Sequence, residues 1–176
     1  MTKNTYKRRL RGRVAVFVAL AAVAIALDQV TKALALARLG NGVSVALPGP
    51  LHGLRLVRNP GASLGLGSGS TWVISLIALA ACLLIIVLAL RTTSMAWTLA
   101  LSLAFSGAAG NLIDRVAYAS GFLDGAVVDF LDYGWSVGNV ADIYLTLAGV
   151  AVVVLIFCNV RFSDGDKPKE HGGEAK

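Results

Sequence analysis

The 176-residue sequence predicts an all-α membrane protein, with four transmembrane helices and a small β element and loops on the outer, extracytoplasmic face. Three observations predict this fold class. The chain is 56% hydrophobic and only 15% charged, with a mean hydropathy of +0.72, whereas a soluble domain is about a quarter charged. Four apolar runs approach the roughly 20 residues that cross a bilayer. Lys and Arg are also distributed unequally over the connections between these runs.

The first apolar run follows a basic arm, residues 1–13, that carries six Lys or Arg and no acid. The stretch from Val14 to Leu27, with Ala-Ile-Ala at 24–26, also has the pattern of a cleavable secretory signal peptide. However, the apolar pattern resumes after Asp28, and the whole segment of about 25 residues is long enough to span a bilayer. We therefore interpret 14–38 as an uncleaved first span.

Three further spans are expected at about 71–90, 95–114 and 140–160. The second of these is rich in Ser, Gly and Ala, and its Ser106 and Gly110 form a small-xxx-small pair that suits close helix packing. The last is interrupted only by Asp142, near its start. Residues 14–160 thus form one four-span membrane domain, with both chain ends on the same side of the membrane.

The distribution of Lys and Arg predicts which side that is. Six lie in the basic arm, one in the turn 91–94 and four in the tail 161–176, against four in the two other connections. Because cytoplasmic connections carry the excess of Lys and Arg, both termini are expected in the cytoplasm. The tail is polar, mixed in charge and contains His171, so we predict that it is disordered.

Composition also excludes some classes of partner. The net charge is +6 and the pI about 9.7, but the basic residues cluster at the chain ends and form no stripe interleaved with aromatics, so no nucleic-acid partner is expected. Cys82 and Cys158 lie inside apolar runs, without a metal-binding spacing or a disulfide framework. We interpret both as small core residues.

Two outer connections are long enough to hold structure of their own. In residues 40–70, two β-prone runs, VSVAL and LRLV, flank a Leu-Pro-Gly-Pro turn, and Asn-Pro-Gly-Ala follows at 59–62 as a second turn. Residues 115–138 contain the strand-like AVVDF. We predict a small β element on the membrane surface.

Ionisable residues inside the spans all fall near their outer ends. Asp28 lies roughly 21 Å along the first span at 1.5 Å per residue, and Lys32 follows one turn later on the same face. The polar residues at this depth are Asp28, Lys32, Asn111, Asp114, Arg115 and Asp142. Long side chains at helix ends can extend to the interface, which would explain Arg115 and Lys32 but not the short Asp28. Because charges within a membrane usually mark function, we predict a polar site just below the outer surface.

The residue types at this site restrict its chemistry. No Ser-His or Cys-His pairing, metal-binding motif or phosphate-binding glycine loop is present, so neither metal nor cofactor is expected. A carboxylate pair remains, and the competing acids are Asp28, Asp114, Asp129, Asp132 and Asp142. Asp28 can pair with Lys32, and Asp114 with Arg115 or another cation. This leaves Asp129 and Asp142 free to share a proton, as a hydrolytic centre requires.

A purely structural alternative exists for the second of these acids. Asn139 lies three residues before Asp142, at the start of the last span. Asn139 could be a helix N-cap, and Asp142 a first-turn acid that suits the helix dipole.

Five motifs in order resemble those of the lipoprotein signal peptidases (signal peptidase II). They are DQVTK at 28–32, NPGAS at 59–63, GAAGNLIDR at 107–115, VVDF at 127–130 and GNVAD at 138–142. The resemblance implies an intramembrane aspartic endopeptidase whose catalytic residues are Asp129 and Asp142. It also implies eight residues that line or brace the site: Asp28, Lys32, Asn59, Gly107, Asn111, Arg115, Asn139 and Ala141.

The resemblance further implies the substrate and the location. The expected substrates are prolipoproteins with a diacylglyceryl-modified lipobox cysteine, cut just before that cysteine, and the expected inhibitors are globomycin-like cyclic peptides. The expected location is the bacterial inner membrane, with the chain a monomer among membrane lipids. Small residues such as Gly107 would leave room for the lipid chains. Two positions depart from the family pattern and affect substrate fit: Val137-Gly138 replaces a frequent Phe before Asn139, and Ser63-Leu64 ends the loop motif.

The sequence disfavours two other classes of membrane protein. A small transporter or channel would place polar residues along a whole path, but the inner halves of these spans have none that ionise. The other aspartic membrane proteases, of the presenilin and prepilin-peptidase kind, have a GxGD pattern at one acid. That pattern is absent before Asp129.

Overall fold

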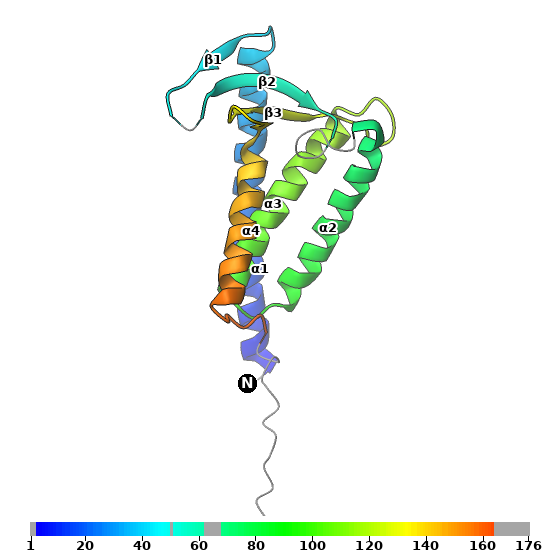
Figure 1. Cartoon of the computed structure of the whole chain (residues 1–176). Helices are drawn as coiled ribbons and strands as arrows, with labels where there is room; N and C mark the ends of the chain where they lie inside the picture. The colour runs from blue at the N-terminus through cyan, green and yellow to red at the C-terminus, as the bar shows by residue number, and fades with distance from the viewer. Residues whose placement is uncertain (1–2, 50, 62–67, 164–176) are drawn as a thin grey trace, which may run out of the picture.

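The computed structural model describes residues 3–49, 51–61 and 68–163, and it forms a helical bundle with a sheet at one end (Figure 1). The helices are α1 (Lys3–Leu39), α2 (Thr71–Arg91), α3 (Met95–Ala117) and α4 (Val140–Phe157), with a short 3-10 helix, η2 (Ser68–Ser70), before α2. The strands are β1 (Ser44–Ala46), β2 (Gly53–Asn59), β3 (Val127–Asp132) and β4 (Val137–Gly138). Each of the four helices contains a stretch long and apolar enough to cross a membrane. The predicted fold class, four membrane-spanning helices with a small β element, is therefore confirmed.

Helix α1 is continuous from Lys3, so the basic arm is part of the first helix rather than a separate segment before it. Its buried residues recur every three or four positions, which places them on one face: Ala21, Ala24, Asp28, Lys32, Ala35 and Leu39. This face packs mainly against α3. Between Arg13 and Asp28 the helix has no charged residue.

Helix α3 packs against all three other helices, and its glycines permit the close approach. A Cβ atom on Gly107 would lie 2.5 Å from the carbonyl oxygen of Ala141 and 2.6 Å from Cγ of Leu145. A Cβ on Gly110 would lie 2.6 Å from Oδ2 of Asp28. The expectation that Gly107 leaves room for lipid is therefore wrong, because α4 fills that space.

The four strands form one antiparallel sheet in the order β1-β2-β3-β4. Strands were predicted in both connections, but their pairing with each other was not. The β2–β3 register places Asn59 opposite Val127 and Val57 opposite Asp129. The sheet is anchored to the last turns of α1 by a small core in which Leu39 and Phe130 are buried. We call this end of the bundle the sheet end.

At the opposite end, α4 stops at Phe157, three residues before the predicted end of the span. The chain then packs against the α2–α3 turn: Nε1 of Trp97 donates to the carbonyl of Val160 at 2.9 Å, and Oγ1 of Thr92 to that of Phe162 at 2.7 Å. Residues 161–163 of the predicted disordered tail are thus held in place. The rest of the tail, with His171, and the variant loop positions Ser63 and Leu64 lie outside the described residues.

The two cysteines differ. Cys82 is buried in α2, as predicted, whereas Cys158 is exposed at the end of α4, so its assignment to the core is wrong. Large apolar side chains such as Leu83 and Leu84 point outward from α2 and are more than half exposed. An apolar exterior of this kind fits a bundle surrounded by lipid.

Candidate active site

Asp129 and Asp142 line the same cavity, of about 760 Å³, at the sheet end. Asp129 is carried by β3, and Asp142 by the first turn of α4. The short hairpin between β3 and β4, in which Leu131 pairs with Gly138, turns the chain back and brings the two carboxyl groups to one place. Gly138 packs tightly here, since a Cβ atom at this position would lie 2.9 Å from Oδ2 of Asp142.

Asn139 is hydrogen bonded to both carboxyl groups. It is the N-cap of α4, and a capping box forms: its Oδ1 accepts from the Asp142 N–H at 3.1 Å, and Oδ2 of Asp142 accepts from the Asn139 N–H at 3.0 Å. Its Nδ2 donates to Oδ1 of Asp129 at 2.6 Å. Asn139 is therefore the helix N-cap, as the structural alternative expected. It also links the two acids, because it donates a hydrogen bond to each of them.

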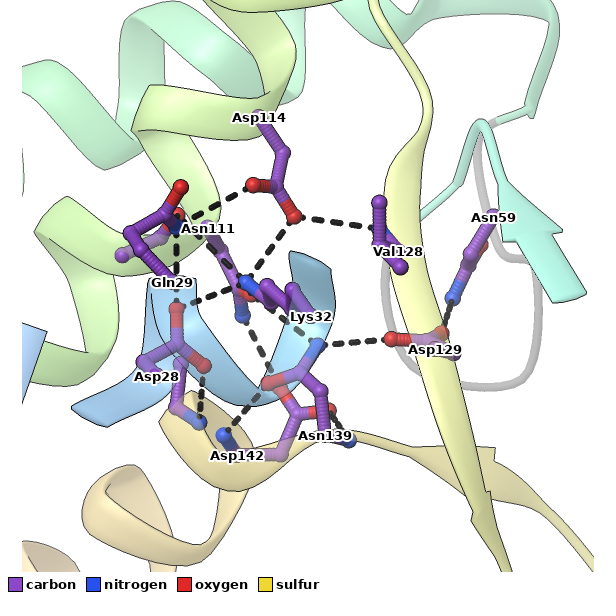
Figure 2. A network of polar contacts seen from close by, with 12 residues as sticks. Asp28, Gln29, Lys32, Asn59, Asn111, Asp114, Val128, Asp129, Asn139 and Asp142 are labelled. Carbon is purple, nitrogen blue, oxygen red and sulfur yellow. Dashed lines mark hydrogen bonds and ion pairs between the residues drawn. The ribbon is translucent and has the colours of Figure 1, made fainter. Parts of the chain in front are cut away.

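Two further amides complete the set of donors. Nδ2 of Asn111 donates to Oδ1 of Asp142 at 2.9 Å, and Nδ2 of Asn59 donates to Oδ2 of Asp129 at 2.9 Å (Figure 2). All four carboxyl oxygens of Asp129 and Asp142 thus accept an N–H from a neutral group. Among the described residues, neither acid forms a salt bridge.

Lys32 is the centre of a second cluster next to these acids. Its Nζ lies 2.9 Å from Oδ2 of Asp28, 2.9 Å from Oδ2 of Asp114 and 3.0 Å from Oδ1 of Asn111 (Figure 2). The predicted pair of Asp28 with Lys32 is confirmed, and the cation that pairs with Asp114 is Lys32 rather than Arg115. Lys32 is 1% exposed, so the interpretation that it extends to the membrane interface is wrong.

The two acids of this cluster also bind backbone N–H groups. Oδ1 of Asp28 accepts from the N–H of Ala141 at 2.9 Å, and Oδ2 of Asp114 accepts from the N–H of Val128 at 3.0 Å. Nε2 of Gln29 donates to Oδ1 of Asp114 at 3.2 Å.

Sequence reasoning missed the contributions of Gln29 and Asp114 to this site. Asp114 was expected among the polar residues near the outer ends of the spans and as a competing acid that needed a cation, but not among the residues that brace the site. A signal was present, because Asp114 follows Gly110 by four residues and Asn111 by three, and therefore lies on the same helix face.

Arg115 lines the cavity and holds the turn after β2. Its Nη2 donates to the carbonyl of Gly61 at 2.7 Å, and its Nη1 to that of Pro60 at 3.4 Å. The N–H of Gly61 in turn donates to Oδ1 of Asn59 at 3.0 Å. Arg115 thereby fixes the turn that carries Asn59 toward Asp129. It is buried, so extension to the interface does not describe it either.

The environment of Asp129 favours its protonated form. Burial raises the pKa of this carboxyl, hydrogen bonds from Asn59 and Asn139 oppose the rise, and the neighbouring charge of Asp142 adds to it, so that the pKa is about 6. A carboxyl with such a pKa can exchange a proton near neutral pH.

The rest of the cavity is mostly apolar. Its walls include apolar side chains of α2 and α4: Ile74, Ile77, Ala78, Ala81, Ile143 and Leu147. At its rim the rings of Tyr133 and Trp135 stack with their centroids 6.2 Å apart. Among residues 3–49, 51–61 and 68–163, no group of three or more His, Cys, Asp or Glu is placed to hold a metal ion.

Known proteins resemble this chain in sequence and in fold. The family model described as "Signal peptidase (SPase) II" matches residues 20–158. A lipoprotein signal peptidase of Bifidobacterium adolescentis is 60% identical over 166 residues, which cover 94% of this chain and 89% of that protein. One of Bifidobacterium longum is 61% identical over 158 residues, 90% of this chain and 87% of that protein. A solved structure of a bacterial membrane enzyme superposes with a TM-score of 0.71 at 26% identity and covers 89% of this chain and 94% of that one. The chain therefore belongs to the signal peptidase II family.

Proposed function

We propose that this chain is a membrane aspartic endopeptidase that removes signal peptides from diacylglyceryl-modified prolipoproteins by cutting just before the lipidated cysteine. Membership of the signal peptidase II family supports removal of signal peptides from lipoproteins. The observation that carries the aspartic mechanism is that Asp129 and Asp142 line one cavity, and that, within the part of the chain that the structure describes, the groups that bind their oxygens are neutral N–H groups.

In the proposed reaction, the two carboxyl groups share one proton. The ionised one takes a proton from a water molecule, which attacks the scissile carbonyl carbon. The protonated one donates its proton to the carbonyl oxygen, which gives a neutral tetrahedral intermediate. The carboxyl that took the proton from water then donates it to the leaving amine as the C–N bond breaks, and the other carboxylate takes back a proton from the hydroxyl as the carbonyl forms again. The raised pKa of Asp129, about 6, supports a pair in which this carboxyl gains and loses its proton slightly below neutral pH.

The remaining site residues hold this pair in place. Asn59, Asn111 and Asn139 orient the carboxyl oxygens. Asp28 and Lys32 brace the start of α4, where Asp28 binds the N–H of Ala141. Arg115 braces the turn after β2, and Gly107 allows α4 to pack against α3, as described above. None of these residues is required to react.

The apolar walls of the cavity support a lipidated substrate. The side chains of Ile77 and Ala81 on α2 and of Ile143 and Leu147 on α4 continue the cavity from the acids along the helices. Acyl chains are apolar and are stabilised by burial there, whereas the peptide groups at the cleavage site need the polar end. A globomycin-like cyclic peptide is proposed to occupy the same cavity.

The placement in the membrane is also a proposal. The excess of Lys and Arg at the end opposite the sheet supports cytoplasmic termini, an outward-facing active site and location in the bacterial inner membrane. All side chains of the two acid clusters come from one chain, which supports a monomer.

The buried hydroxyl groups of α3 argue against a transport function. The hydroxyls of Thr98, Ser102 and Ser106 each donate to the carbonyl four residues earlier in the same helix, at 2.7–2.9 Å. They are therefore bonded within the helix rather than arranged along a polar path.

The test is cleavage in detergent of a synthetic diacylglyceryl-modified lipobox peptide and of its unlipidated twin, by the wild type and by Asp142→Asn. We expect the wild type to cut only the lipidated peptide, with mass spectrometry placing the cut just before the cysteine, and the variant to cut neither. Equal cleavage of both peptides would contradict the lipid requirement. No cleavage by folded wild-type protein would contradict the proposed reaction.

A further inference from the structure

Each catalytic aspartate of the proposed peptidase follows a residue whose backbone N–H binds another carboxylate. Ala141, just before Asp142, donates to Asp28, and Val128, just before Asp129, donates to Asp114. Both accepting carboxylates also bind the same ammonium group, that of Lys32.

The arrangement links four elements of the fold through the side chain of Lys32 and its two carboxylate partners. Asp28 and Lys32 lie on α1, and Asp114 lies on α3, whereas the bound N–H groups belong to β3 and α4. Asp28, Lys32 and Asp114 are each at most 1% exposed, so water does not compete for these bonds. Charged hydrogen bonds in such surroundings are short and strong.

The Asp114 bond is not part of the ordinary pairing of the sheet. Val128 lies on β3, which pairs with β2 on one side, and its N–H points to α3 instead (Figure 2). The bond therefore sets the distance and orientation of β3 relative to the bundle at the residue before Asp129. Gln29 holds the other oxygen of Asp114, which fixes the orientation of this carboxylate.

We propose that Asp114 is a positioning residue: by binding the Val128 N–H and Lys32 together, it places the Asp129 carboxyl opposite Asp142. This inference rests on the proposed function. Asp114 does not line the cavity, so it acts through β3 and not by contact with the substrate. Loss of its charge leaves Lys32 paired with Asp28 alone.

The experiment compares Asp114→Asn, Asp114→Glu and Asp124→Asn with the wild type, using the lipidated peptide. Asp124 is the matched control, because its exposed carboxylate also binds backbone N–H groups, of Ser120 and Gly121, in the loop before β3. We expect Asp114→Asn to lower kcat by about 10- to 100-fold with KM unchanged, because a small misplacement of a reacting group has effects of this size. Asp124→Asn should cleave like the wild type.

The pH profile separates positioning from a general folding defect. The charged and titratable groups near Asp129 are Lys32 of α1, Arg115 of α3, Asp142 of α4 and Tyr133 after β3. Asp114 acts on this set through its ion pair with Lys32, whose charge it offsets. Removing the negative charge of Asp114 favours the ionised form of Asp129, so Asp114→Asn should shift the profile of kcat to lower pH. Asp114→Glu keeps the charge and should lower kcat without that shift. A loss of folded protein alone would scale the activity and leave the profile in place.

The outcomes distinguish this inference from the proposed function. If the wild type cleaves and Asp114→Asn has wild-type kcat and pH profile, the positioning role is wrong while the peptidase stands. If the folded wild type does not cleave, the proposed function itself fails. If Asp114→Asn cannot be obtained folded, Asp114→Glu decides: reduced kcat at an unchanged thermal midpoint supports the role, and wild-type kcat overturns it.

Discussion

Two pairs of acids lie side by side at the sheet end, and they are held in different ways. Asp28 and Asp114 share the ammonium group of Lys32, whereas the partners of Asp129 and Asp142 among residues 3–49, 51–61 and 68–163 are neutral amide groups. A buried carboxylate beside a cation makes short, strong charged hydrogen bonds that hold both groups in place. Carboxyl groups held by neutral amides can gain or lose a proton without leaving a buried cation unpaired. Asp28 and Asp114 are therefore suited to holding neighbouring groups in position, and Asp129 and Asp142 are suited to transferring protons.

The largest expected effect comes from removing the exchangeable protons. Asp129→Asn or Asp142→Asn should lower kcat by at least about 10²- to 10⁴-fold, the usual contribution of a general acid or base. Turnover of the lipidated peptide measures this. Asp132→Asn, on the same strand as Asp129, is the control and should remain active. A folded Asp129→Asn or Asp142→Asn protein with wild-type turnover would remove that residue from the reacting pair.

Next in size is the effect of removing the shared cation. Lys32→Met leaves Asp28 and Asp114 buried without an ion-pair partner, which should cost about 3–5 kcal/mol of folding free energy. Arg55→Met is the matched control, because Arg55 pairs with Asp132 at a site where its side chain is 50% exposed, and such pairs contribute about 0–1 kcal/mol. Unfolding in detergent compares the two, and equal stability would contradict the central place given to Lys32.

The raised pKa of Asp129 gives a pH-dependent stability with a definite sign. In the folded protein the pKa of Asp129 is about 6, whereas an aspartate side chain in the unfolded chain has the ordinary value of 3.8. Between these pH values the folded protein therefore binds more protons than the unfolded chain. The stability contributed is complete below the lower value and is lost as pH rises through about 6. The thermal midpoint of the wild type, minus that of Asp129→Asn, should therefore fall between about pH 4 and about pH 6. A rising difference would contradict the assignment.

A smaller effect is expected from helix packing that supports both clusters. Gly107→Ala would place a Cβ atom against the backbone of α4, which carries Asp142, and such overpacking costs about 1–3 kcal/mol. Gly149→Ala is the control, because a Cβ atom there meets no other atom within 4 Å and alanine favours the helix. Thermal midpoints and kcat of the two variants test this contrast. Equal behaviour would show that close packing at Gly107 is unimportant.

The sequence was sufficient for the four spans and for the pair of Asp28 with Lys32, and insufficient for contacts that depend on tertiary pairing. Apolar runs and helical spacing are local, so the four spans and the contact of Asp28 with Lys32 could be predicted. The pairing of β2 with β3, and with it the contact of Asn59 with Asp129, joins segments about 70 residues apart and has no local signal. The same holds for the bond from Val128 to Asp114.

Two errors have a related cause. Gly107 was expected to leave space for lipid, because a small residue indicates close approach without saying what approaches. Cys158 was placed in the core because its neighbours are apolar, but in a membrane protein apolar residues also cover the outside of the bundle.

The most direct test of the central claim is the pH dependence of kcat/KM for the wild type, measured with a lipidated peptide that has no ionisable side chain near the cut. If Asp129 and Asp142 share one catalytic proton, the profile is bell-shaped, because one carboxyl must be ionised and the other protonated. We expect one limb near pH 6, the pKa of Asp129. A profile that is flat from about pH 4 to about pH 9 would contradict the account, because no carboxyl would then gain or lose its proton in the range where the pair must do so.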